Sequence, residues 1–101
     1  MNTTEKILRV TAVFKAKPGK EAEVQAGLET LIQPTRKEVG CIRYDLHRHE
    51  TEPGVFLFDE EWQSKADLEV HFTQPHILKL REILPDLLAE PRELNLWNPV
   101  E

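Results

Sequence analysis

Two short segments of alternating polar and apolar residues, 41–49 and 55–62, limit the possible folds of this chain more than any other feature. The turn sequence ETEPG lies between them. Because successive side chains of a strand point to opposite faces, each segment has the pattern of a strand, and the pair is predicted to form a β-hairpin. One face of the first strand is expected to carry Ile42, Tyr44 and Leu46, and the opposite face Cys41, Arg43, Asp45 and His47.

The remaining segments predict one strand before this hairpin, and helices and a last strand around it. Residues 7–16 are rich in β-branched and aromatic types and carry apolar residues on both faces, which is typical of a strand covered on both sides. Helical periodicity predicts helices over 20–33, 65–72 and about 76–89. Residues 92–98 are predicted to form the final strand.

Local signals mark the ends of these helices. Ser64 is expected to cap the second helix, with Asp67 three residues later. Pro34 weakens the end of the first helix, and Pro85 is predicted to kink the third. The apolar side of the third helix is predicted to comprise Ile77, Leu80, Ile83, Leu84, Leu87 and Leu88.

The order βαββαβ predicts a ferredoxin-like α+β fold with an antiparallel sheet. A chain of 101 residues has room for one core, so we expect a single domain over residues 1–101. Helices in this fold cover only one face of the sheet. Because the strands carry apolar residues on both faces, the open face is expected to pack on a second copy, which makes the protein a homodimer.

Composition excludes several classes of protein. The formal net charge is −5 and basic residues alternate with acidic ones, which argues against a nucleic-acid partner. No apolar run approaches the roughly 20 residues of a membrane span, and no signal peptide is evident, so we expect a cytoplasmic protein without a membrane partner. Cys41 is the single cysteine, and zinc spacings and Gly-rich phosphate loops are absent. We therefore expect no bound cofactor.

Glu60 stands out because it shares the parity of Phe56, Phe58 and Trp62 on one strand face. A carboxyl group among aromatic rings loses solvation, which raises its pKa and suits it to proton transfer near neutral pH. The alternative is an ion pair with Arg43 or Arg48, or a solvated position at the rim. Trp62 itself is compatible with the core or with the mouth of a pocket.

His71 and His76 are five residues apart, with Pro75 between them. On one continuous helix this spacing would place them on different faces, unlike the i, i+4 pair of a metal-binding helix, so no metal site is expected. His71 is predicted to point under its helix toward the sheet. These residues indicate a candidate pocket but do not by themselves define a reaction.

The run VGCIRYDLHRHETEPGVFLFDEEWQSKADLEVHFTQPH resembles the antibiotic biosynthesis monooxygenase family of dimeric α+β barrel proteins. The likeness rests on Gly40-Cys41 followed by Tyr44, on FLFDEEW, on ADLEVHFTQPH and on the ending PRELNLWNP. It extends from about residue 7 to residue 99. It implies a homodimer in which two ferredoxin-like sheets pack face to face.

The resemblance also implies an activity, since several members oxidise quinols or polycyclic phenols with molecular oxygen and without flavin, haem or metal. On this basis we expect a small aromatic substrate, oxygen as co-substrate and no cofactor. His71 is the expected base, and Glu60 is expected to orient it or to act in its place. Residues expected to line the substrate slot or close its rim are Tyr44, Trp62, Phe72 and His76.

Two other functions remain open. The segment Thr73 to His76, with Arg92 and Trp97-Asn98, also resembles an isomerase of phosphorylated autoinducer-2, which would act on a small phosphorylated keto compound. A non-catalytic dimer that binds a small aromatic ligand is the second alternative. Haem-degrading relatives are a third comparison, but no residue here matches their haem-binding group.

Overall fold

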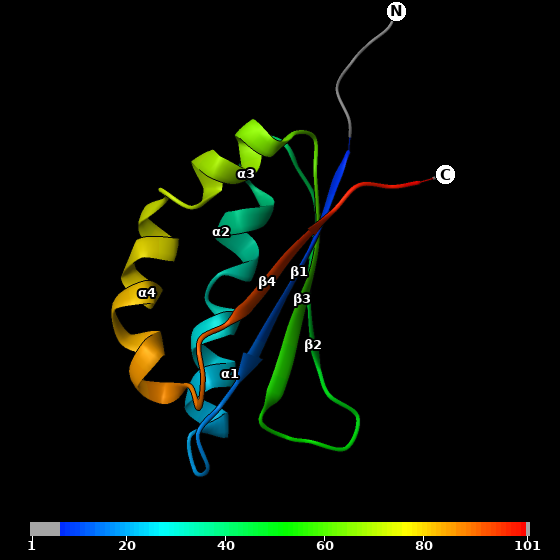
Figure 1. Ribbon diagram of the computed structural model, residues 1–101. Coiled ribbons are helices and arrows are strands. Elements are labelled where there is room, and N and C mark those ends of the chain that lie inside the picture. Colours follow the sequence, from blue (N-terminus) through cyan, green and yellow to red (C-terminus); the bar gives the residue numbers. More distant parts are fainter. Residues whose placement is uncertain (1–6, 101) are drawn as a thin grey trace, which may run out of the picture.

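Four antiparallel strands form one sheet in the order β2-β3-β1-β4, and four helices lie on one side of it in the computed structural model (Figure 1). The structure describes residues 7–100. This is the ferredoxin-like α+β fold that the sequence predicts. The elements are β1 (Leu8–Lys15), α1 (Glu21–Glu29), α2 (Ile32–Arg36), β2 (Cys41–Arg48), β3 (Val55–Trp62), α3 (Lys65–His71), α4 (Pro75–Leu87) and β4 (Glu93–Trp97).

The core lies between the sheet and the helices. In the two central strands every second residue is buried, which confirms the predicted periodicity; the buried residues of β1 and β3 are Leu8, Val10, Ala12, Phe14, Phe56, Phe58, Glu60 and Trp62. The residues between them lie on the other face, which no helix covers in Figure 1. Arg9 and Asp59 form an ion pair there.

A β-bulge changes the predicted faces of β2. Cys41 pairs with Trp62 and Arg43 pairs with Glu61, so Ile42 has no partner of its own. Because the bulge inserts one residue, Cys41 and Tyr44 share the helix-covered face, and Ile42 is 45% exposed. The prediction that Ile42 and Tyr44 lie on the same face, with Cys41 opposite, was therefore wrong.

The first predicted helix is two helices. α1 ends at Glu29, and α2 starts at Ile32, so Pro34 lies in the first turn of α2 rather than at a helix end. A proline is tolerated there because backbone N–H groups of the first turn have no partner within the helix. Ile83 in α4 is 56% exposed, so its predicted place on the apolar side was also wrong.

Two contacts position the helices. Ser64 caps α3 as predicted, since its hydroxyl accepts a hydrogen bond from the Asp67 amide at 3.2 Å. Gly27 lets α1 lie close to α4, because a Cβ at this position would stand 2.9 Å from Leu80 Cδ1. Among the described helices, none is both long and apolar enough to span a membrane.

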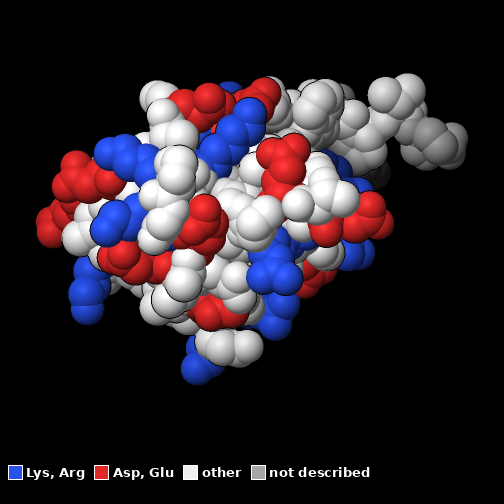
Figure 2. All heavy atoms as spheres, turned by 90° about the horizontal axis from the view of Figure 1, so that it is seen from below, with Lys and Arg blue, Asp and Glu red and all other residues white. Residues whose placement is uncertain are grey.

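The surface carries charges of both signs. On the face shown in Figure 2, lysine and arginine side chains are interspersed with aspartate and glutamate, in line with the net charge of −5. No continuous basic stripe is visible on that face, whereas a phosphate backbone requires one.

Candidate active site

A cavity of about 410 Å³ lies between the helix-covered face of the sheet and α4. Phe14 and Phe58 of the sheet, Leu80 and Leu84 of α4, and Leu28 of α1 supply apolar walls. A cavity of this size is within the range of pockets that enclose small organic ligands.

Six polar side chains also line this cavity: Tyr44, Glu60, His71, Arg81, Glu90 and Arg92. Glu90 forms an ion pair with Lys15. Tyr44 stacks on Phe58, with ring centroids 4.3 Å apart. Of the six site residues expected from the sequence, the structure brings Tyr44, Glu60, His71 and Phe72 to the cavity wall. The other two, Trp62 and His76, lie behind that wall: Trp62 donates to Glu60, and the centroid of the His76 ring lies 6.3 Å from that of His71.

Glu60 is enclosed by the core and is only 4% exposed. Its Oε1 accepts a hydrogen bond from Trp62 Nε1 at 2.9 Å. Burial raises the pKa of the Glu60 carboxyl to about 7, and the hydrogen bond from Trp62 offsets part of that rise. The alternative ion pair with Arg43 does not form, because Arg43 pairs with Asp45 and Glu61 instead.

Trp62 belongs to the core rather than to the mouth of the cavity, since its side chain has no exposed surface. The indole ring lies 4.8 Å from the His71 ring, measured between centroids. Its contact with the site is therefore indirect: it donates to Glu60 and packs against His71.

His71 ends α3 and points toward the sheet, as predicted. Its Nδ1 lies 2.9 Å from Oε2 and 3.1 Å from Oε1 of Glu38. Burial lowers the pKa of His71, and the hydrogen bond and charge of Glu38 oppose that change. Within residues 7–100, Nε2 has no hydrogen-bond partner, so it is free to meet a molecule in the cavity.

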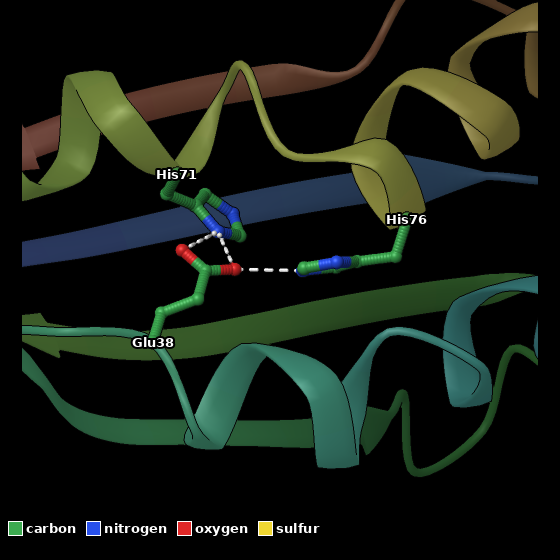
Figure 3. A group of neighbouring side chains, drawn as sticks. All are labelled: Glu38, His71 and His76. Carbon is green, nitrogen blue, oxygen red and sulfur yellow. Dashed lines mark hydrogen bonds and ion pairs between the residues drawn. The ribbon is translucent and has the colours of Figure 1, made fainter.

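The same carboxylate reaches His76, whose Nε2 lies 2.6 Å from Glu38 Oε2 (Figure 3). Between α3 and α4 the backbone of Gln74 is extended, as expected for a residue before proline. This break turns His76 toward His71. The two histidines therefore lie on different helices, and their spacing of five residues does not keep them apart.

Sequence reasoning missed Glu38. This residue lies in the loop between α2 and β2, 33 positions before His71, and no local pattern singles it out. Gly40 holds that loop against α3: its backbone φ is +85°, and a Cβ there would stand 2.7 Å from Asp67 Cβ and overlap the Asp67 carboxylate. The close approach places Glu38 beside the end of α3.

Glu38, His71 and His76 each offer one atom suited to a metal ion, and these atoms lie within 4.8 Å of one another. Ligands around a tetrahedral zinc ion lie roughly 3.3 Å apart, given metal–nitrogen bonds of about 2.0–2.1 Å. The distances of 2.6 and 2.9 Å are instead those of hydrogen bonds. A metal ion would have to separate these groups.

Two arginines occupy one part of the cavity wall. Arg92 lies over the Phe72 ring, 5.7 Å from its centroid, and burial together with Arg81 lowers the pKa of the Arg92 guanidinium. Across the described part of the chain, neither guanidinium has an ion-pair partner. The cavity therefore combines apolar walls with positive charge. Sequence reasoning missed Arg81 and noted Arg92 only in the comparison with the isomerase.

Comparison with known proteins identifies relatives over most of the chain. The family model "Antibiotic biosynthesis monooxygenase" matches residues 7–83. The "Uncharacterized protein sll1783" of Synechocystis is 41% identical over 91% of this chain, which spans only 63% of that protein's length. The "Putative monooxygenase Rv0793" of Mycobacterium tuberculosis is 32% identical over 91% of this chain and 90% of that protein.

Solved structures agree with this assignment. The structure of Rv0793 covers 94% of this chain and 96% of its own, with a TM-score of 0.89 at 30% identity. PA3566 from Pseudomonas aeruginosa covers 99% and 100%, with a TM-score of 0.93 at 27% identity. Since the family model matches most of its length, the chain belongs to the antibiotic biosynthesis monooxygenase family.

Proposed function

We propose that this protein oxidises an electron-rich phenol or quinol with molecular oxygen, and that the substrate anion itself supplies the electrons. The observation that carries the proposal is an imidazole nitrogen and a carboxyl group of raised pKa in the wall of one apolar cavity. Membership of the family and relatives named as monooxygenases support the reaction type.

The chemistry requires a base and a dry pocket. Loss of the phenolic proton gives an electron-rich anion that can reduce triplet oxygen. One oxygen atom then enters the ring as a carbonyl group, and the other leaves in water together with the O–H and ring C–H hydrogens. The protein must therefore accept a proton early, return one to the departing oxygen and keep bulk water out.

The side chains fit these tasks. Nε2 of His71 is the base, since it has no partner among residues 7–100 and its Nδ1 is held by Glu38. Glu60, with a pKa of about 7, can hold or release a proton near neutral pH. Arg81 and Arg92 stabilise the substrate anion. Tyr44 and Phe72 pack against the aromatic ring.

We also propose that the protein is a homodimer in which a second copy packs on the face of the sheet that lacks helices. The sheet face that lacks helices carries Val13 and Leu57 half-buried, and Trp97 is 53% exposed. A second copy packed on this face would cover these side chains and enlarge the small core of a 101-residue domain. Light scattering of the purified protein at several concentrations tests this: a mass of one chain throughout would contradict it.

Oxygen consumption tests the reaction. Protein freed of metal and flavin is mixed with a panel of hydroquinones and naphthohydroquinols, and uptake is compared with that of His71→Ala at equal concentration, because these compounds autoxidise. His49→Ala is the matched control, since His49 is an exposed histidine at the hairpin that follows β2. We expect uptake that His71→Ala loses and His49→Ala keeps.

Uptake no faster than autoxidation for every compound would overturn the proposal. The two alternatives then separate readily. An isomerase would convert a small phosphorylated keto compound without consuming oxygen. A binding protein would only raise its melting temperature in the presence of an aromatic ligand.

A further inference from the structure

Three titratable side chains form a chain that runs from the cavity toward the surface. His71 lines the cavity, Glu38 lies behind it, and His76 stands at the start of α4 (Figure 3). Their side chains are 3%, 10% and 20% exposed, in that order. The atoms that join them are 2.9 Å and 2.6 Å apart. Exposure thus rises along an unbroken series of hydrogen bonds.

A buried base needs a path by which the proton that it accepts can reach solvent. Burial disfavours a charged imidazole at His71, so a proton that stays on this ring is costly. His71 has little contact with solvent, and direct release of the proton to water is obstructed. A side chain that accepts the proton from the far side of the ring removes this obstacle.

We propose that Glu38 and His76 form a proton relay that connects His71 with solvent. This inference rests on the proposed function, since it assigns the path of the proton that His71 removes from the substrate. It adds two participants that lie outside the cavity wall.

The transfer balances without a buried net charge on the relay. At the start, Nδ1 of His71 carries a proton, and a second proton joins Oε2 of Glu38 to Nε2 of His76. The phenolic proton moves to Nε2 of His71, and the Nδ1 proton moves to Oε1 of Glu38. The Oε2 proton then moves to Nε2 of His76, which releases its Nδ1 proton to water.

The products of this sequence are a phenolate in the cavity and one proton in solvent. The relay ends with the net charge with which it began, and its protons lie on the opposite atoms. The reverse sequence returns a proton to the oxygen that leaves in water and restores the starting arrangement. Both oxygens of Glu38 lie within 3.1 Å of His71 Nδ1, which lets one accept while the other donates.

Charged and titratable groups of the neighbouring elements act on this relay. Cys41 and Tyr44 of β2 and Glu60 of β3 interact electrostatically with Glu38. Arg81 of α4 interacts with His71. Any change of pH that titrates Glu60, whose pKa is about 7, will therefore also affect the relay.

The relay predicts a loss of kcat that a small proton acceptor can restore, whereas a purely structural role for Glu38 and His76 predicts no such rescue. In the His76→Ala protein, we expect kcat to fall by about tenfold while KM changes little, because removal of one proton-transfer group costs less than the 10²–10⁴ of the base itself. Added imidazole can enter the vacated space and accept the proton, so it should restore kcat. His49→Ala, an exposed histidine at the hairpin, is the control for imidazole effects.

Glu38→Gln separates relay from positioning, because glutamine keeps the shape and hydrogen-bonding capacity but cannot pass a proton between its two ends. We expect a loss of kcat with an unchanged melting temperature, and no rescue by imidazole. A wild-type kcat in either variant overturns the relay. So does a loss in His76→Ala that imidazole fails to reverse.

A measurement without substrate keeps this proposal distinct from the proposed function. The ring ¹⁵N resonances of His71 and His76 are followed by NMR against pH. We expect both rings to report the same two titration steps in the wild type, and independent single steps in Glu38→Gln. Independent titration in the wild type overturns the relay. Shared steps without oxygen uptake overturn the proposed reaction and leave the proton path intact.

Discussion

The regions around Glu38 and Glu60 give the same side chain opposite surroundings. Glu38 lies in a loop and contacts two imidazole rings. Glu60 lies in the middle of β3, where one donor among residues 7–100, the indole N–H of Trp62, bonds to it. Both regions meet at His71, which bonds to Glu38 and packs against Trp62.

This difference shows that the number of donors and the degree of enclosure, rather than residue type, determine what a carboxyl group can do. Enclosure with one donor favours the protonated form of Glu60 near neutral pH. Two imidazole partners on Glu38 instead connect it to groups that exchange protons. A substitution in one region should leave the other in place, so the two regions can be tested separately.

The largest expected effect comes from Gly40→Ala, which disturbs the Glu38 region alone. An alanine would have to adopt φ of +85° and would also overlap Asp67. We expect the free energy of unfolding to fall by about 3 kcal/mol, measured by urea denaturation. Gly19→Ala is the control, because Gly19 has the same φ but nothing within 4 Å of the added Cβ; it should cost about 1 kcal/mol. Equal losses would contradict the close approach of the loop to α3.

Glu60→Gln should change how stability depends on pH. The folded-state pKa of about 7 lies above the ordinary value of 4.5, so between these values the folded chain keeps a proton that the unfolded chain releases. Wild-type stability therefore falls as pH rises through this window, by about 3 kcal/mol in total. The variant lacks this loss. Measured by urea denaturation, its stability relative to wild type should rise from pH 4.5 to pH 8.

The lowered pKa of His71 acts in the opposite direction, since its contribution is lost as pH falls below the ordinary value of 6.5. That contribution is present in both proteins and cancels in the difference between them. A difference between Glu60→Gln and wild type that stays constant from pH 4.5 to 8 would mean that Glu60 titrates normally.

Trp62→Phe removes the indole N–H that donates to Glu60. The buried carboxyl group would lose its hydrogen bond, which should cost about 2 kcal/mol in the free energy of unfolding. The double variant with Glu60→Leu, which removes the acceptor, completes a thermodynamic cycle and separates lost packing from the lost hydrogen bond. A coupling energy near zero would show that the indole N–H does not stabilise the carboxyl group.

The smallest effect is expected from Arg92→Gln. The positive charge of Arg92 lowers the pKa of Glu60, so its removal should move the Glu60 pKa further upward. The pH at which stability falls should therefore increase, as seen in the same denaturation series. Arg48→Gln, an exposed arginine on β2, is the control. An unchanged pH would show that the charge of Arg92 does not act on Glu60.

The sequence predicts some parts of this molecule well because they depend on local periodicity. The alternation in β3 was sufficient to place Glu60 on the same face as Phe58 and Trp62. It did not predict the bulge at Ile42, because one unpaired residue leaves no mark on composition. The fold was therefore predictable, but not the face of every residue.

The candidate site was predictable only in part, for a related reason. His71 and Glu60 lie in elements with clear patterns, whereas Glu38 comes from a loop that long-range contacts bring to α3. The break before Pro75 was expected, but the direction in which it turns His76 depends on those same contacts. Spacing along one helix could not reveal a partner from a distant segment.

Gly27 has a consequence for which molecules the cavity admits. It does not line the cavity, but Leu80, which does, lies against the space that a Gly27 side chain would fill. Any larger residue at position 27 would push the end of Leu80 toward the bound molecule. Residue 27, which lies outside the cavity, thus affects whether the cavity can hold a ligand with one ring or with several rings. The methyl group of an alanine at position 27 would reduce the largest ligand that fits.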